Sequence, residues 1–185
     1  MLGIARGEGE AFAHLVRRHS PWAFRLLYRL LGQRALAEDV LQSCFVQIWE
    51  KPSAWVPRAQ FRTWLYRVLH NRCLDHFRRH QRQSNLDPHV LDATEAIDDT
   101  LDDAQQAAVG LVQPGIEQGV MQRVDVQTAL QSLPERQRAA IVLVYFEDLS
   151  QIEVAGIMGV SVGALESLLS RARVQLSRQL AAHRH

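Results

Sequence analysis

The strongest constraint on this chain is a helical repeat of apolar residues that fills both ends of the sequence and is missing from the middle. Apolar residues recur at intervals of three and four from residue 10 to about residue 82, and again from residue 120 to about residue 180. No useful run of alternating apolar and polar residues occurs, so a β-sheet is not expected. The sequence therefore predicts an all-α fold built from two helical blocks.

The stretch between the two blocks has the composition of a linker. Residues 81–126 hold 2 Lys+Arg against 9 Asp+Glu, whereas residues 1–80 hold 13 against 6. The middle stretch also lacks Phe, Trp and Tyr and contains prolines and glycines, so it cannot bury enough apolar surface to fold alone. We therefore expect two small helical domains, 8–82 and 120–182, joined by an acidic flexible linker, 83–119.

Several protein classes are not expected from the composition. No apolar run of about 18 residues is present, so no membrane insertion is expected. Glu8 and Glu10 lie where a secretory signal would need an apolar stretch. Cys44 and Cys73 both fall within apolar helical patterns, which argues against a disulfide framework and favours the reducing cytoplasm.

The basic residues are almost all arginine. Of the 21 Lys+Arg, only Lys51 is lysine. The planar guanidinium suits two-point contact with phosphates and base edges, so this bias favours a nucleic-acid partner. A solvated surface encoded by GC-rich DNA explains the bias equally well, and both interpretations stay open.

Residues 37–49 predict the clearest amphipathic helix. One apolar stripe consists of Ala37, Val40, Leu41, Cys44, Phe45, Ile48 and Trp49. The opposite face is polar, and its simplest interpretation is a solvated surface.

A second predicted helix, residues 61–79, combines an apolar side with basic and aromatic side chains. Its cations are Arg62, Arg67, Arg72, Arg78 and Arg79. Trp64 and Tyr66 lie among them, a mixture that suits single-stranded DNA because arginines hold phosphates while rings stack on bases. Alternatively, the aromatic residues belong to the core and the arginines keep the surface soluble; composition does not decide between the two.

The same helix carries three residues of types that bind metals. His70, Cys73 and His76 follow one another at spacings of three, which brings neighbouring members within reach of each other. No CxxC motif accompanies them, and Cys44 lies on the apolar stripe of another helix. We expect neither a metal site nor a cofactor. His70, His76 and Asp75 as an acid–base cluster is a weak alternative, and no glycine-rich phosphate loop or nucleophile–base motif supports an enzyme.

The C-terminal block predicts a helix-turn-helix. One helix is expected to begin with Ser132 as its N-cap. Ser150 and Glu153 form the pattern of a capping box, which begins a short helix that stops at Gly159. Ser161 is then placed to cap a further helix, which in a helix-turn-helix lies in the major groove of DNA. Helical hairpins that do not bind DNA share this shape.

The helix after Ser161 has two faces. The residues expected to pack inward are Val162, Leu165, Leu168, Leu169, Ala172 and Leu176. The residues expected to face outward are Glu166, Ser167, Ser170, Arg171 and Arg173.

Motifs in both blocks resemble one known family. The segments AEDVLQSCFVQIW (37–49) and FRTWLYR (61–67), with Asn71 and Asp75, resemble the second conserved region of bacterial RNA polymerase sigma factors. The C-terminal block resembles the fourth conserved region of the same factors in three segments: LPERQR (133–138), YFEDLS (145–150) and VSVGALESLLSRAR (160–173). Two regions and little else is the layout of the extracytoplasmic-function (ECF) group of the sigma-70 family.

This resemblance implies a transcription initiation factor with no catalytic chemistry of its own. Such a factor binds core RNA polymerase, recognises the −10 and −35 promoter elements and assists strand opening. The polar face of residues 37–49 corresponds to the surface that docks on the β′ coiled coil of core polymerase. The resemblance also implies the β flap of the polymerase as a partner. The implied polymerase-binding residues are Asp39, Gln42, Ser43 and Gln47. Ser43 departs from the acidic residue often found there.

The resemblance also implies two sets of DNA-binding residues. Those for the −10 element, which capture an unstacked base and hold the non-template strand, are Arg58, Arg62, Trp64, Arg67, Asn71 and Arg72. Those for the −35 element are Ser161, Glu166, Ser167, Ser170, Arg171 and Arg173. Many members carry a basic residue where this chain has Glu166 and an arginine where it has Leu168. A glutamate accepts from the amino group of cytosine, so altered base preference is expected.

The family further implies an anti-sigma factor as a regulatory partner and a stress response as its setting. The acidic linker resembles the segment that sigma factors thread through the polymerase, although a solvated tether explains it equally well. The main alternative is a regulator that binds DNA alone through its helix-turn-helix. Association with core polymerase distinguishes the two functions.

Overall fold

The computed structural model describes residues 2–52, 60–84 and 123–182, and this part of the chain is helical without a β-strand. The predicted all-α fold is therefore confirmed. The elements are α1 (Leu2–Ala5), α2 (Gly9–Leu31), α3 (Arg34–Glu50), α4 (Phe61–Ser84), α5 (Arg123–Gln131), α6 (Glu135–Ile141), the π-helical turn η4 (Val142–Phe146), α7 (Gln151–Met158) and α8 (Val162–Ala182). Of the predicted linker, residues 85–119 lie outside the described residues, as does Arg58.

The N-terminal set, α1 to α4, is built around α2. Buried residues recur on α2 at helical spacing, at Ala23, Leu26, Leu27 and Leu30, and α3 and α4 pack against this stripe. Gly32 ends α2 in the left-handed conformation, with φ of 77°, which costs glycine little because it has no Cβ. The chain can therefore reverse direction into α3.

Pro21 does not interrupt the fold. It lies inside the 23-residue helix α2. Proline removes one backbone donor from a helix. Here the buried residues before and after it belong to one continuous stripe, so packing against α3 and α4 outweighs that loss.

The C-terminal set contains the predicted helix-turn-helix. The Ser150 hydroxyl accepts from Glu153 N–H at 3.3 Å, and the Glu153 carboxylate accepts from Ser150 N–H at 3.0 Å, so the capping box is confirmed. Gly159 ends α7 with φ of 68°. Ser161 accepts from Ala164 N–H at 3.2 Å at the start of α8. The start of α7, its end at Gly159 and the start of α8 are therefore as predicted.

Two details of the C-terminal set were predicted wrongly. Ser132 is not an N-cap: Pro134 takes that position before α6, and the Ser132 hydroxyl donates instead to Ala129 O at 2.6 Å. Val162 does not pack inward, because it is the first residue of α8 and 39% of its surface is exposed. The inward face begins one turn later, at Leu165.

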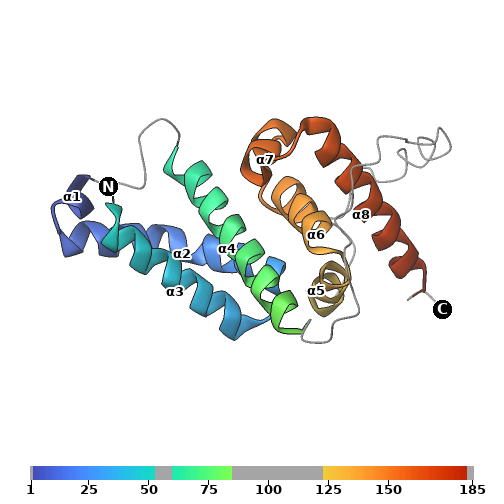
Figure 1. Cartoon of the computed structure of the whole chain (residues 1–185), viewed down its shortest axis with the longest axis horizontal. Coiled ribbons are helices and arrows are strands. Elements are labelled where there is room, and N and C mark those ends of the chain that lie inside the picture. The colour runs from blue at the N-terminus through green and yellow to red at the C-terminus, as the bar shows by residue number, and fades with distance from the viewer. Residues whose placement is uncertain (1, 53–59, 85–122, 183–185) are drawn as a thin grey trace.

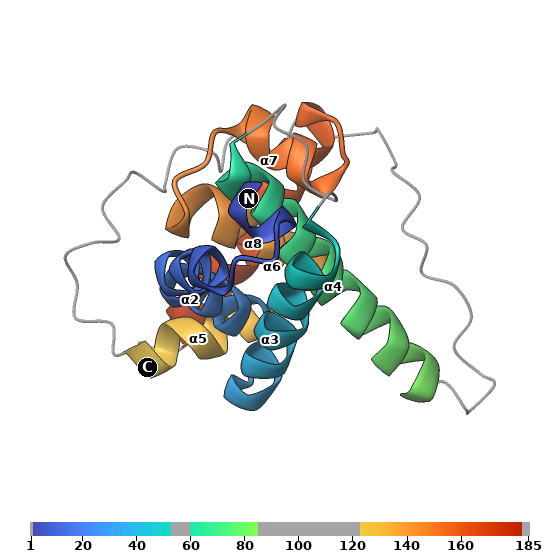
Figure 2. The ribbon, with the colours of Figure 1, turned by 90° about the vertical axis from the view of Figure 1, so that its left-hand side faces the viewer.

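The two sets of helices lie against each other. In Figure 1 the N-terminal helices occupy one side and the C-terminal helices the other, with α4 crossing between α3 and the α6–α7 region. In the view turned by 90°, α7 lies at the top, above α2 and α3 (Figure 2). α4 packs on α7, and α2 packs on α5, α6 and η4. Residues far apart in the sequence thus form one continuous core.

Among the described residues, no single helix has the length and apolarity of a membrane span. The pair formed by α7 and α8 meets that test only when taken together, and the two helices are bent by 98° at the turn between them.

Candidate polymerase-binding and DNA-binding surfaces

The polar face of α3 is an open surface. Ala37, Cys44 and Ile48 anchor the opposite side of the helix in the core. The four predicted polymerase-binding residues are consequently all exposed: Asp39, Gln42, Ser43 and Gln47.

Two large apolar side chains extend this polar surface. Val46 and Trp49 are 46% and 38% exposed. Trp49 was expected on the buried stripe, but it lies near the end of α3 and part of its ring reaches solvent. The centre of its ring is 5.0 Å from that of the Phe12 ring. Val46 was not predicted as a surface residue because it lies outside the apolar stripe of this helix. An apolar residue on the polar side of the helix was the signal in the sequence that could have found it.

The predicted −10 residues that the structure describes all lie on α4, and their burial differs. Arg62, Arg67 and Asn71 are exposed, whereas Trp64 and Arg72 are half-buried. The Trp64 ring packs against Phe61 at 5.4 Å. The aromatic residues thus contribute to the core and the arginines to the surface, a combination of the two interpretations that the sequence left open.

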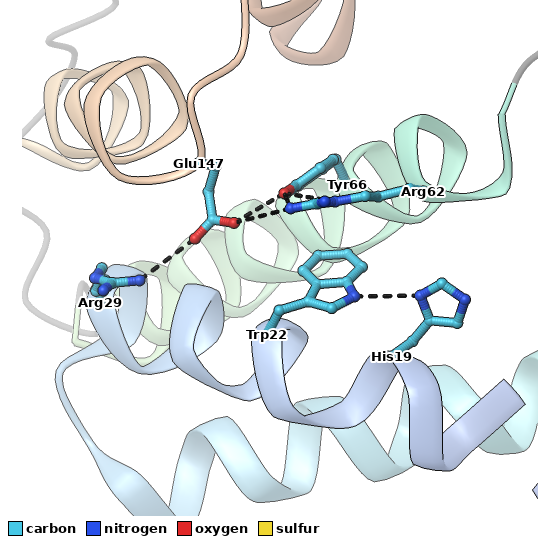
Figure 3. Close-up of polar contacts among 6 residues, drawn as sticks. All are labelled: His19, Trp22, Arg29, Arg62, Tyr66 and Glu147. Carbon is cyan, nitrogen blue, oxygen red and sulfur yellow. Dashed lines mark hydrogen bonds and ion pairs between the residues drawn. The ribbon is translucent and has the colours of Figure 1, made fainter. Parts of the chain in front are cut away.

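Arg62 is held by contacts within its own domain. Its Nη2 donates to the Tyr66 hydroxyl at 2.8 Å, and its guanidinium lies 5.2 Å from the centre of the Trp22 ring (Figure 3). The positive charge of Arg62 also helps to lower the pKa of His19, an effect to which burial contributes most and Arg18 next.

The C-terminal set also reaches this part of α4. The Glu147 carboxylate projects from the turn after η4 toward α2 and α4 (Figure 3). It accepts from the Tyr66 hydroxyl at 2.8 Å and pairs with Arg29 at 3.3 Å. Burial raises the pKa of Tyr66, and the hydrogen bond to Glu147 and its charge raise it further. Sequence reasoning missed Glu147, which was noted only as part of a family motif.

Ser161 precedes α8 and caps its start, and the other predicted −35 residues lie on α8 between Glu166 and Arg173. Ser161, Glu166 and Arg171 are exposed, and Ser167, Ser170 and Arg173 are half-buried. Arg173 donates from Nε to Leu169 O at 3.2 Å, which directs part of its guanidinium along the helix. The structure therefore leaves the side chains of Glu166 and Arg171 accessible on α8.

A hollow of about 310 Å³ lies beside Arg171 of α8. It is lined by Gln137, Ser170, Arg171, Val174, Gln175 and Arg178. Arg178 lies seven residues after Arg171, so helical geometry places both cations on one side of α8. Arg178 was not predicted, although this spacing was visible in the sequence.

The residues considered for metal binding do not form a site. His70 and Cys73 are buried in the core, and burial lowers the pKa of His70 and raises that of Cys73. Within the described ranges, no group of three His, Cys, Asp or Glu is arranged to hold a metal ion.

Comparison with known proteins assigns the chain to a family. Residues 15–83 match the model of Sigma-70 region 2, and residues 123–176 match that of Sigma-70, region 4. The ECF RNA polymerase sigma factor SigW of Bacillus subtilis is 30% identical over 177 residues, which cover 96% of this chain and 92% of the relative. The chain belongs to the ECF group of sigma-70 family factors.

Solved sigma factors have the same fold. The structure of CnrH in complex with the cytosolic domain of CnrY shares 27% identity and a TM-score of 0.63, covering 98% of this chain and 94% of that one. The sigma factor RpoE in complex with the anti-sigma factor NepR, from Bartonella quintana, has a TM-score of 0.68 at 22% identity, covering 93% and 98%. This ECF sigma factor is accordingly a transcription initiation factor, and the matched ranges of region 2 and region 4 overlap α2–α4 and α5–α8 respectively.

Proposed function

We propose that this ECF sigma factor brings core RNA polymerase to promoters through three surfaces: the polar face of α3, the basic face of α4 and the exposed face of α8. The observation that carries the proposal is that both sigma regions match the chain in order, over residues 15–83 and 123–176, and that these ranges contain the three exposed surfaces. The units of function are 8–82 and 120–182, with 83–119 as the connection between them.

The α3 surface suits protein binding better than DNA binding. Its predicted contact residues are one carboxylate, Asp39, and the neutral side chains Gln42, Ser43 and Gln47, and they are flanked by exposed Val46 and Trp49. An exposed aromatic beside polar side chains is typical of a protein interface. We assign this surface to the β′ coiled coil of core polymerase.

The α4 surface suits single-stranded DNA. Arg62, Arg67 and Arg72 provide cations along one helix, and Asn71 adds an exposed amide. Trp64 is half-buried and positioned by Phe61, so it offers a rigid ring edge rather than a mobile side chain. Cations that hold phosphates next to fixed rings are the usual arrangement for an unpaired strand.

The α8 surface suits the major groove at the −35 element. Ser161, Ser167, Ser170 and Arg173 lie along the same half of the helix as Glu166 and Arg171. Arg171 contacts phosphate or guanine, and Glu166 accepts from a cytosine amino group. The turn between α7 and α8, fixed by Gly159 and Ser161, presents the start of α8 as in other helix-turn-helix proteins.

Regulation follows from the family and its structural relatives. Two of the similar structures are sigma factors bound to anti-sigma or cytosolic regulatory partners. We propose that an anti-sigma factor controls this chain as well, that it acts in the cytoplasm beside its polymerase, and that the chemistry of RNA synthesis belongs to the polymerase alone. The exposed apolar residues Tyr145 and Ile152 in region 4 offer a surface for the β flap.

The test of the proposal is assembly with core RNA polymerase. Purified chain mixed with core enzyme should co-elute in size-exclusion chromatography as a one-to-one complex. Tight binding to a DNA operator without any association with core enzyme would contradict the proposal and favour a regulator that acts alone.

A further inference from the structure

Trp22 of α2 lies against the side chain of Arg62, one of the predicted −10 residues. The guanidinium carbon of Arg62 is 5.2 Å from the centre of the Trp22 ring, a distance at which a cation is attracted to the face of an indole (Figure 3). The Trp22 ring also packs on the Tyr66 ring at 4.7 Å, and the Tyr66 hydroxyl accepts from Arg62. The Arg62 side chain is nevertheless 54% exposed. Its guanidinium is therefore held in place while a phosphate can still reach it.

His19 fixes the orientation of the Trp22 ring. The Trp22 indole Nε1–H donates to Nδ1 of His19, three residues earlier on α2, at 3.2 Å (Figure 3). Nε1–H is the only hydrogen-bonding group of an indole, so this bond decides where the polar edge of the ring points. An acceptor at Nδ1 requires a neutral imidazole with its proton on Nε2. The hydrogen bond thus depends on the protonation state of His19.

The imidazole of His19 also packs against the start of α4. Its ring centre lies 5.0 Å from that of Phe61, the first residue of α4. The Phe61 ring in turn packs on Trp64, a second predicted −10 residue, at 5.4 Å. Two lines of contact therefore start at His19. The first reaches Arg62 through the Trp22 ring, and the second reaches Trp64.

The charges about His19 favour its neutral form. Burial contributes most to lowering the pKa of His19, and Arg18, Arg62 and His14 act in the same direction through their charges. Arg18 and His14 lie on α2 with His19, whereas Arg62 comes from α4. At pH 7 the imidazole is therefore neutral and accepts from Trp22. Protonation would place an N–H against the indole N–H and add a positive charge beside the two arginines.

We propose that His19 is a positioning residue for the single-stranded −10 element: as a neutral acceptor it fixes Trp22, and through Trp22 it holds the Arg62 guanidinium where a DNA phosphate binds. His19 acts through Trp22 and needs no contact with DNA. This inference rests on the proposed function, because Arg62 is taken there as a −10 residue. Sequence reasoning did not single out His19, which lies on a different helix from the predicted −10 residues that the structure describes.

Two substitutions separate the acceptor of His19 from its bulk. In His19→Asn the side-chain amide oxygen lies near the position of Nδ1 and accepts from the Trp22 indole. His19→Leu fills a similar space without any acceptor. His14→Leu is the matched control, because it removes an imidazole from an exposed position of the same helix. Helical circular dichroism confirms that each variant is folded.

The hydrogen bond is measured on the full chain by two-dimensional nitrogen–proton NMR of the tryptophan indole groups. The chain has four tryptophans, so Trp22→Phe assigns the Trp22 signal. The Trp22 indole proton should resonate at lower field in the wild type and in His19→Asn than in His19→Leu. In the wild type it should also shift as the pH falls below 6.5, the ordinary pKa of histidine. A Trp22 signal that is identical in all three proteins and independent of pH would overturn the inference.

The effect on DNA is measured by the fluorescence anisotropy of fluorescein-labelled (dT)20, because phosphate contacts and base stacking require no particular base. Loss of one hydrogen bond corresponds to about two- to tenfold in an equilibrium constant. We expect His19→Leu to bind (dT)20 more weakly than the wild type by that factor at pH 7.5, and His19→Asn and His14→Leu to bind nearly as well as the wild type. In an Arg62→Ala background His19→Leu should cause little further loss, because the side chain that it positions is gone.

The pH profile separates positioning from simple charge. A protonated His19 adds a positive charge, which by itself strengthens binding to a polyanion. The inference predicts the opposite sign. Below pH 6.5 the wild type should lose affinity for (dT)20 relative to His19→Asn, which keeps its acceptor at every pH. A constant ratio of the two affinities between pH 7.5 and pH 5.5, while the Trp22 indole signal titrates, would contradict the positioning role.

Failure of this inference and failure of the proposed function give different results. If His19→Leu binds (dT)20 as tightly as the wild type while Arg62→Ala binds more weakly, Arg62 contacts DNA without help from His19 and the inference alone fails. If Arg62→Ala binds as tightly as the wild type, the assignment of α4 to the −10 element fails and the inference fails with it.

Discussion

At the residue scale, the specificity of this sigma factor depends on a few side chains that the fold leaves in solvent. Glu166 is the one whose chemistry differs most from that of a usual DNA-contacting residue, because a carboxylate repels phosphates. It lies exposed on α8, five residues before the exposed Arg171. A carboxylate in that place is productive only if it accepts from a base, so Glu166 should select the sequence rather than strengthen binding.

Replacement of Glu166 by lysine should change the preferred −35 sequence. The substitution exchanges an acceptor for cytosine amino groups with a donor for guanine O6 and N7, and discrimination of about 1–3 kcal/mol at one base pair should be redirected. Sequencing transcripts from a promoter library with a randomised −35 element measures the preference. A second library randomised at −10 is the control, since its preference should not change; an unchanged −35 preference would refute the role of Glu166.

His70 makes the stability of the protein depend on pH. Burial is the largest cause that lowers the pKa of His70 below its ordinary value of 6.5, and the charge of Arg136 acts in the same direction. The unfolded chain therefore binds a proton at a higher pH than the folded chain does. The contribution of the neutral His70 imidazole to stability is fully present above about pH 6.5. It is lost as the pH falls from there toward the lower pKa of the folded state.

The expected outcome is a smaller acid sensitivity in His70→Gln than in the wild type. Urea unfolding at pH 7.5 and pH 5.5 gives the free energy of unfolding for both proteins, and the wild type should lose more of it between the two values. His14→Gln, at an exposed position, is the matched control. If His70→Gln and the wild type show equal losses, the buried imidazole does not govern this dependence; His19, whose pKa is lowered too, would then be the group to examine.

At the element scale, the structure shows which local signals in the sequence are sufficient to predict where a helix begins and of which type it is. The capping box of α7 was predicted to the residue because Ser150 and Glu153 satisfy each other's backbone donors without outside help. Ser132 failed as an N-cap because its hydroxyl has competing partners, Ala129 O and Gln179, one of which is distant in sequence. The π-helical turn η4 was not predicted either, since an apolar run has the same appearance in an α-helix.

Removal of the α7 capping box should destabilise region 4 modestly. Ser150→Ala eliminates the hydroxyl that accepts from Glu153 N–H, and the loss of such a cap costs about 0.5–2 kcal/mol of unfolding free energy. Chemical unfolding followed by circular dichroism measures the change. Ser177→Ala, on the exposed side of α8, should change stability by less than about 0.5 kcal/mol; equal effects of the two variants would contradict the capping role.

At the scale of the whole molecule, the order of the helices and the surfaces of α3, α4 and α8 could be predicted from sequence, but the packing of the two regions could not. Periodicity identifies which face of a helix is buried, yet it does not name the partner. The contacts of Glu147 with Arg29 and Tyr66 join residues 118 and 81 positions apart. Side chain to backbone contacts such as that of Arg138 with Leu30 leave no pattern in a sequence.

The polymerase interface gives a prediction at this scale. Asp39→Lys reverses the one charge among the four predicted contact residues of α3, and it should weaken association with core polymerase by at least about tenfold while leaving the helical content unchanged. Asp75→Lys, a reversal at another exposed carboxylate, on α4, should bind nearly as well as the wild type. Surface titration against immobilised core enzyme gives both affinities. Equal affinities for the two variants would remove the α3 face from the interface.

The most direct measurement of the central claim is transcription in vitro from a fragmented genomic library, with purified core RNA polymerase and this chain, followed by sequencing of the RNA 5′ ends. We expect start sites that depend on the added chain and share two sequence elements at a fixed separation upstream. Start sites that are the same with and without the chain would contradict its role as a promoter-specificity factor.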